Sequence, residues 1–115
     1  MSRRDDQLAL VKMRNHAAEA IAILGESSLN DLEENRVTEL GLWKLLEIIG
    51  EAANRISAET QRLHQEVPWP QIMAMGNRMV YGYDDISLER LWDTTKWELP
   101  PLVKQLDLLI DKENL

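Results

Sequence analysis

The segment LLEIIGEAANRIS, residues 45–57, has the apolar spacing of a helix that packs on its neighbours. It closes a predicted helix over about residues 36–57, in which apolar side chains recur every three or four positions. Gly50, Ala52 and Ala53 are small enough to let a neighbouring helix approach closely. The apolar stripe predicted for this helix consists of Val37, Leu40, Leu42, Leu45, Leu46, Ile49, Ala52, Ala53 and Ile56.

Helical spacing also precedes this stretch. Residues 5–24 predict an amphipathic helix that ends at Gly25, because glycine readily adopts the left-handed conformation that terminates helices. Ser28 followed by Asp31 predicts the capped start of a short helix. The stripe predicted for residues 5–24 is Leu8, Val11, Ala18 and Ile21, widened by Leu10, Ala17 and Leu24.

The pattern continues downstream. Pro70 suits the first position of another helix, and Gly82 is well placed to end that helix. Residues 88–109 keep one apolar phase across Pro100-Pro101, so they form one kinked helix or two collinear helices. The sequence therefore predicts an all-α fold, an up-and-down antiparallel bundle of about four main helices with additional short ones.

Length and composition narrow the class of protein. The 115 residues predict a single domain, residues 1–115. The absence of cysteine excludes disulfides and thiolate metal sites, and the net charge of −7 works against non-specific binding of nucleic acid. The sequence has no run of membrane-spanning length and no signal-peptide pattern, so we expect a soluble, cytoplasmic protein with no membrane partner.

The segment GNRMVYGY, residues 76–83, places polar residues inside a hydrophobic pattern. In a purely structural interpretation, Gly76 is a packing glycine, Arg78 is a surface charge and the tyrosines cover a helix end. In a functional interpretation, the segment is a site. Positions 76 and 81 are about 140° apart on a helix, so they meet at one ligand only if the helix ends between them or a second subunit closes the site.

Two pairs of side chains have the helical spacing of metal ligands, His16 with Glu19 and Glu47 with Glu51. A solvated helix face is the favoured interpretation of both pairs, because di-metal bundles use a repeated Glu-x-x-His pattern that this chain lacks. No metal site is therefore predicted, and Glu51 is the better candidate of the four.

Four tryptophans, Trp43, Trp69, Trp92 and Trp97, are of the kind that stacks on nucleobases. Trp43 and Trp92 lie close to apolar stripes, and the chain has no phenylalanine to fill core volume. Core packing is therefore the favoured role for these two side chains.

The order of the motifs resembles a known family. A W-x-x-I-x-x-M motif starts at Trp69, and Gly82-Tyr83, an acidic turn, Trp92 and the L-P-x-L motif of residues 99–102 follow it. This order is similar to the C-terminal half of the HepT-like proteins of the HEPN superfamily, and residues 45–57 resemble the second long helix of that family. The resemblance covers about residues 5 to 110.

The resemblance implies a fold and a function. HepT-like proteins are toxins of toxin–antitoxin pairs and act as endoribonucleases on RNA without a metal or other cofactor. They form homodimers in which two copies of the motif face each other across a cleft. A small MNT nucleotidyltransferase antitoxin neutralises them by attaching AMP to the tyrosine of the motif, and toxin and antitoxin can form larger hetero-oligomers.

The signature of the family is Arg-Asn, three residues, His, one residue and Tyr. Asn77 matches the asparagine and Tyr83 the tyrosine that accepts AMP. Gly76 occupies the arginine position and Tyr81 the histidine position. Both residues that the resemblance implies for cutting RNA are therefore substituted in this chain.

The substitutions matter because of the chemistry they remove. Cleavage of RNA without a metal needs a base for the ribose 2′-hydroxyl and a cation for the phosphate, tasks that suit histidine and arginine. Loss of a general base alone costs about 10²–10⁴-fold in rate. Arg78 lies about 200° round the helix from position 76, so it does not replace the arginine. Arg78 and Glu51 are expected to support the cleft.

Three hypotheses follow from these residues. The first is a HepT toxin subunit with an impaired ribonuclease site. The second is a non-catalytic HEPN-like module that binds a nucleotide or scaffolds a nucleotidyltransferase. The third is an unrelated helical adaptor that shares the motif by chance.

Overall fold

The computed structural model describes residues 3–81 and 87–111, and for residues 79–81 it describes the backbone alone. These residues form an all-α fold without strands, as predicted. No helix within them is long and apolar enough to cross a membrane. The helices are α1 (Arg3–Leu24), α2 (Leu29–Glu33), α3 (Arg36–Asn54), α4 (Ala58–Leu63), α5 (Trp69–Tyr81), α6 (Leu88–Asp93), the π-helical segment η2 (Thr94–Glu98) and α7 (Leu99–Leu109).

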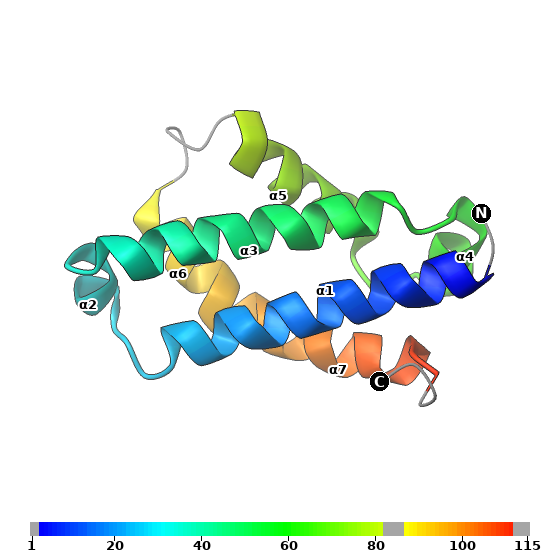
Figure 1. Cartoon of the computed structure of the whole chain (residues 1–115), viewed down its shortest axis with the longest axis horizontal. Helices are drawn as coiled ribbons and strands as arrows, with labels where there is room; N and C mark the ends of the chain where they lie inside the picture. The colour runs from blue at the N-terminus through cyan, green and yellow to red at the C-terminus, as the bar shows by residue number, and fades with distance from the viewer. Residues whose placement is uncertain (1–2, 82–86, 112–115) are drawn as a thin grey trace.

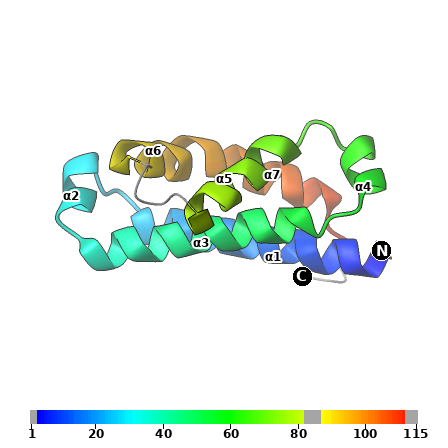
Figure 2. The same cartoon turned by 90° about the horizontal axis from the view of Figure 1, so that it is seen from above.

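The long helices run up and down around one core. α1 and α3 lie side by side and antiparallel, α5 crosses α3, and the α6–α7 segment packs along the other side of α1 (Figure 1). Figure 2 shows the same bundle from above, with α2 and α4 at its two ends. The most deeply buried large side chains of the core include Leu10, Met13, Leu24, Leu32, Leu42, Leu46, Ile49, Leu91, Leu99 and Leu106.

The predicted end of α1 and the predicted start of α2 are confirmed. Gly25 follows α1 with a φ of 54°, the left-handed conformation that favours glycine. Ser28 and Asp31 form a reciprocal capping box, because the Ser28 N–H donates to Asp31 Oδ2 at 2.9 Å and the Asp31 N–H donates to Ser28 Oγ at 3.1 Å. Gly82, predicted to end α5, lies outside the described residues.

The phase of α1 differs from the prediction. Leu8 was expected to belong to the apolar stripe, but its side chain is 57% exposed. It lies two positions before the buried Leu10, so it is rotated about 200° from Leu10 to the opposite face of the helix. Met13 and Ala20, which the predicted stripe left out, occupy the core instead. The buried stripe of α1 runs through Leu10, Met13, Ala17, Ala20 and Leu24.

The first turn of α3 also departs from the prediction. Val37 and Leu40 were expected in the core, but they are 81% and 47% exposed. The buried stripe begins only at Leu42, which is fully buried. α3 ends at Asn54 rather than at Ser57, because Ser57 caps α4 with its hydroxyl group.

The C-terminal helix is irregular just before its prolines. The Leu99 N–H donates to the Thr94 carbonyl, five residues back, which widens η2 into a π-helical turn. Pro100 has no N–H, and in a regular α-helix its ring would collide with the carbonyl four residues before it. The π-helical segment accommodates this ring, so α6 and α7 continue as one interrupted helix. The interruption lies immediately upstream of Pro100-Pro101, where the sequence predicted a kink.

Candidate functional site

Gly76 lies at the point where α5 crosses α3. A Cβ atom added to Gly76 would lie 2.7 Å from Gly50 Cα, and one added to Gly50 would lie 2.4 Å from Gly76 Cα. Real Cβ atoms essentially never come so close to backbone, so the two helices touch backbone to backbone here. The sequence predicted a close approach at Gly50 and, in the purely structural interpretation, a packing role for Gly76, but it did not predict that the two glycines meet. Position 76 is therefore filled by a neighbouring helix and has no room for a side chain without a shift of α5.

Asn77 and Arg78 follow Gly76 on α5, and both are exposed. Within the described part of the chain, neither side chain makes a hydrogen bond or an ion pair. Successive residues are about 100° apart on a helix, so Arg78 and Gly76 project on nearly opposite sides of α5. Both polar side chains therefore lie on the surface of the described part of the chain.

Glu51 lies on α3 beside the crossing. Its backbone N would be 3.5 Å from a Cβ atom on Gly76, which places it next to the motif in space. Its carboxylate pairs with Arg55, at 3.0 Å between Glu51 Oε1 and Arg55 Nη2, and both side chains are 58% exposed. The prediction that Glu51 lies near the motif therefore has a structural basis, although its carboxylate points along α3.

Tyr81 is the last residue of α5, and the structure describes only its backbone. Tyr83 lies outside the described residues, as do the Asp84 and Asp85 of the predicted acidic turn. The predicted shared pocket of positions 76, 77, 81 and 83 therefore stays a prediction. The structure describes the surroundings of Gly76 and Asn77, two of the four members. For Tyr81 it describes only the backbone.

The pairs considered as metal ligands have other partners. His16 Nδ1 donates to the Lys12 carbonyl at 2.7 Å, and Glu47 Oε2 lies 3.5 Å from Lys44 Nζ. Among the residues described here, no group of three or more His, Asp or Glu side chains is arranged to hold a metal ion.

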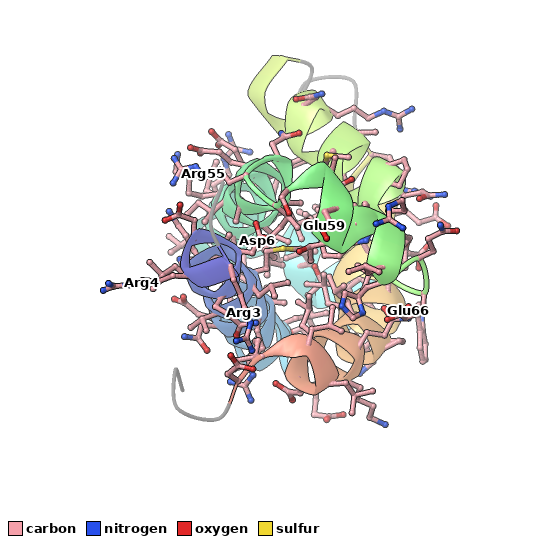
Figure 3. All side chains as sticks on the ribbon, turned by 90° about the vertical axis from the view of Figure 1, so that its right-hand side faces the viewer. Arg3, Arg4, Asp6, Arg55, Glu59 and Glu66 are labelled. Atoms are coloured by element: carbon pink, nitrogen blue, oxygen red, sulfur yellow. The ribbon has the colours of Figure 1, made fainter. Side chains whose placement is uncertain are left out.

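A buried carboxylate that the sequence did not single out lies at the far end of the bundle. Asp6 on α1 is only 5% exposed and accepts three hydrogen bonds: from the Ser57 N–H at 2.8 Å, from Ser57 Oγ at 2.6 Å and from Thr60 Oγ1 at 2.6 Å. Figure 3 shows Asp6 in the end view, between α1 and the start of α4. Burial opposes its charge, but these hydrogen bonds outweigh it, so the pKa of Asp6 is lowered from the ordinary 3.8.

Asp6 is a structural residue rather than a member of the motif site. It joins the first turn of α1 to the Ser57 that caps α4, across 51 residues of sequence. No local pattern predicts such a contact. The nearest signal in the sequence is the acidic pair Asp5-Asp6 in the first turn of α1, which is equally typical of solvated charges at a helix start.

Comparison with known proteins places these features in a family. The family model described as "Ribonuclease HepT-like" matches residues 13–109, which is most of the chain. The chain belongs to the HepT-like ribonuclease family. The matched range includes α3, α5 and the whole motif of residues 76–83, so the predicted resemblance is confirmed.

Individual relatives agree with this assignment. The chain is 31% identical over 96 residues to "Probable ribonuclease HepT" of Thermococcus cleftensis, covering 80% of this chain and 87% of that protein. It is also 31% identical over 87 residues to "Putative RNase TTE0752" of Caldanaerobacter subterraneus, covering 76% and 78% respectively. No solved structure shows a significant match.

Proposed function

We propose that this chain is the toxin subunit of a HepT/MNT toxin–antitoxin pair whose ribonuclease site is impaired. Membership of the HepT-like ribonuclease family supports the ribonuclease class. Asn77 and Tyr83 keep two positions of the motif, whereas Gly76 and Tyr81 replace the arginine and the histidine. Tyr83 accepts AMP from the nucleotidyltransferase antitoxin, and two chains pair so that their motifs share one cleft.

The packing of Gly76 is the observation that carries the proposed impairment. An arginine clamp for phosphate requires a long side chain that reaches the substrate. At this position, even a Cβ atom would lie 2.7 Å from the backbone of Gly50. The chain thus has no cation at the clamp position, and α5 has settled against α3 in the space that a side chain would need.

Tyr81 removes the second requirement for catalysis. Transfer of the 2′-hydroxyl proton needs a base whose pKa lies near the working pH. A phenol with an unperturbed pKa of about 10 is almost fully protonated at pH 7, so it abstracts protons poorly. Without base and clamp, the expected cleavage rate is several orders of magnitude below that of an intact site.

Restoring both residues tests the proposal. Four proteins are compared: the parent chain, Gly76→Arg, Tyr81→His and the double variant. Cleavage of a labelled single-stranded RNA is measured with a metal chelator present, because the proposed chemistry needs no metal. We expect activity in the double variant alone, since base and clamp act in the same step.

The restored variants need a check of folding. Because an arginine side chain at position 76 would push α5 away from Gly50, Gly76→Arg is expected to lower the melting temperature, so the assay is run well below that temperature. Circular dichroism and light scattering establish that each variant is folded and paired. A folded, dimeric double variant that leaves RNA intact contradicts the proposed ribonuclease site.

A second candidate is a non-catalytic module that binds a nucleotide or scaffolds a nucleotidyltransferase. The same contact between Gly76 and Gly50 favours it, because a glycine needed for packing is not simply a lost catalytic residue. Calorimetry with ATP and AMP separates the two candidates. Tight nucleotide binding by the parent, with no cleavage in the double variant, would support this module.

A further inference from the structure

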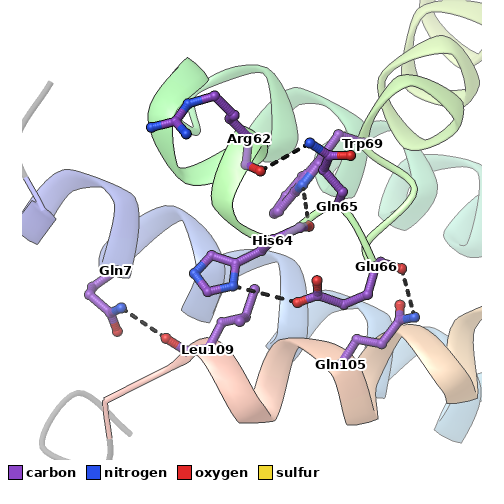
Figure 4. A network of polar contacts seen from close by, with 8 residues as sticks. All are labelled: Gln7, Arg62, His64, Gln65, Glu66, Trp69, Gln105 and Leu109. Atoms are coloured by element: carbon purple, nitrogen blue, oxygen red, sulfur yellow. Dashed lines mark hydrogen bonds and ion pairs between the residues drawn. The ribbon is translucent and has the colours of Figure 1, made fainter.

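A groove of about 420 Å³ lies between α5 and the α6–η2–α7 segment. Its apolar part includes Ile72 and Met75 of α5, which face Leu102 of α7. At one end of the groove Gln105 Nε2 donates to the Glu66 carbonyl at 2.9 Å, and in the adjoining segment Trp69 Nε1 donates to the His64 carbonyl at 2.9 Å (Figure 4). The groove is therefore an ordered feature of the bundle.

Trp97 lies at this groove and differs from the other three tryptophans. Its side chain is 63% exposed. Trp43, Trp69 and Trp92 each donate their indole N–H to a neighbouring oxygen, whereas the indole of Trp97 has no such acceptor among the described residues. Its ring packs edge-on against Trp92, with ring centroids 6.2 Å apart and planes at 78°. Trp97 is thus held from one side and offers an open aromatic surface.

Two polar side chains of the groove can donate hydrogen bonds to a ligand. Arg90 and Gln71 line the groove, and neither side chain makes a hydrogen bond or ion pair within the described part of the chain. The two acids of the groove are engaged, since Glu98 accepts from Thr94 Oγ1 at 3.1 Å and Glu66 lies 3.5 Å from His64 Nδ1. A ligand rich in acceptors and carrying a flat ring fits this set of groups.

We infer that the groove is a nucleotide-binding subsite for single-stranded RNA. A base stacks on Trp97, Arg90 contacts a phosphate, and the Gln71 amide bonds the edge of the base. This inference rests on the proposed function, which makes RNA the substrate. It also predicts the path of the bound RNA. Gln71, Met75 and Arg78 follow the i, i+4, i+7 spacing along one side of α5, so the groove leads towards the motif.

RNA fits better than a protein segment because of what the groove leaves unpaired. Each carboxylate of the groove has a neighbour within the chain, Thr94 for Glu98 and His64 for Glu66, whereas the Arg90 side chain has no ion-pair partner among the described residues. Stacking on an exposed tryptophan also tolerates any base, as a ribonuclease that binds unpaired strands requires.

Binding of a short, unstructured RNA to the intact chain tests the subsite. Fluorescence anisotropy is measured for the parent, Trp97→Leu, Trp97→Phe and Arg90→Gln. Loss of one stacked base should weaken binding by about 5- to 150-fold in Trp97→Leu, whereas Trp97→Phe keeps a ring and most of the affinity. Arg90→Gln should lower the slope of affinity against salt by about one phosphate contact.

Arg4→Gln is the matched control, because Arg4 points into solvent on the opposite side of the molecule from Glu66 (Figure 3). We expect its affinity for RNA to match that of the parent. If Trp97→Leu and Arg90→Gln bind RNA like the parent but lose binding to a nucleotidyltransferase partner, the groove is a protein-docking surface and the inference is wrong. The inference also fails if the parent binds no RNA.

The two proposals fail separately. If the double variant cleaves RNA but Trp97→Leu binds RNA as tightly as the parent, the proposed subsite is wrong and the ribonuclease proposal stands. If Trp97→Leu weakens RNA binding but the double variant does not cleave RNA, the ribonuclease proposal is wrong and the subsite stands.

Discussion

At the scale of single residues, the contact between Gly50 and Gly76 is the most specific feature of the chain. Each glycine allows the other helix to approach within backbone contact. In other helical positions glycine is a liability, because it lowers helix stability by about 1 kcal/mol relative to alanine. The close contact of the two helices therefore accounts for both glycines, because a side chain at either position would collide with the backbone of the other helix.

Alanine substitutions test this explanation. We expect Gly76→Ala and Gly50→Ala each to lower the free energy of unfolding by about 1–3 kcal/mol, because the added methyl group meets backbone that cannot turn aside. Gly41→Ala is the control: a Cβ there meets nothing within 4 Å, so it should raise the free energy by about 0.5–1 kcal/mol. Urea unfolding measures all three. Equal changes in the free energy of unfolding at the three positions would contradict the backbone contact between α3 and α5 at Gly50 and Gly76.

Asp6 makes a prediction about pH. Its pKa in the folded chain lies below the ordinary 3.8, so its contribution to stability is complete above that pH and is lost as pH falls through the folded value. Asp6→Asn should lower the free energy of unfolding at pH 7 by about 1–3 kcal/mol, and the difference from the parent should shrink below about pH 4.

A second carboxylate serves as the control for Asp6. Asp107 pairs with Arg14 at 2.8 Å, but both side chains are about one-third or more exposed. Exposed pairs contribute at most about 1 kcal/mol, so Asp107→Asn should have little effect at any pH. Equal losses of unfolding free energy in Asp6→Asn and Asp107→Asn would contradict the claim that the hydrogen bonds of Asp6 stabilise the fold more than an exposed ion pair does.

At the scale of the elements, Trp92 ties the C-terminal helix to the turn after α1. Its indole N–H donates to the Ser27 carbonyl at 2.9 Å, across 65 residues of sequence. Trp92→Phe should lower the free energy of unfolding by about 1–2 kcal/mol, because it leaves that carbonyl without its donor. Trp97→Phe, which removes no such bond, should change it by less than about 0.5 kcal/mol. Thermal unfolding of both variants measures this difference.

The elements also show what a sequence can predict. Helix ends were predicted correctly where a side chain caps its own turn, as with Ser28 and Asp31, because that chemistry is local. The phase of α1 was wrong because Leu8 and Leu10 are both apolar, and only the position of the neighbouring helices selects Leu10 for the core. The network of Asp6 and the partner of Gly50 were missed for the same reason: each joins residues distant in sequence.

At the scale of the whole molecule, the proposed function requires two chains. Asn77 and Arg78 are exposed and unpaired within the described residues, so a second subunit can approach them. Light scattering should give a particle of twice the 13.3 kDa of one chain at micromolar concentration. A strict monomer would remove the shared cleft and favour an unrelated helical adaptor.

The charge of the whole chain sets a further condition on RNA binding. With a net charge of −7, the protein attracts RNA only where cations are concentrated locally. Arg90 of α6 lines the groove, and Arg78 lies on α5 three residues beyond Met75, which also lines it. Pairing of two chains would bring a second set of these residues to the same cleft.

The central claim is that the motif site has lost its phosphate clamp and its general base, because Gly76 and Tyr81 occupy their positions. The most direct test is the rate of metal-free RNA cleavage by the Gly76→Arg, Tyr81→His double variant, relative to the parent chain. We predict a parent rate indistinguishable from that of buffer and a double-variant rate at least about 10²-fold higher. A parent that already cleaves RNA as fast as the folded double variant would contradict the account.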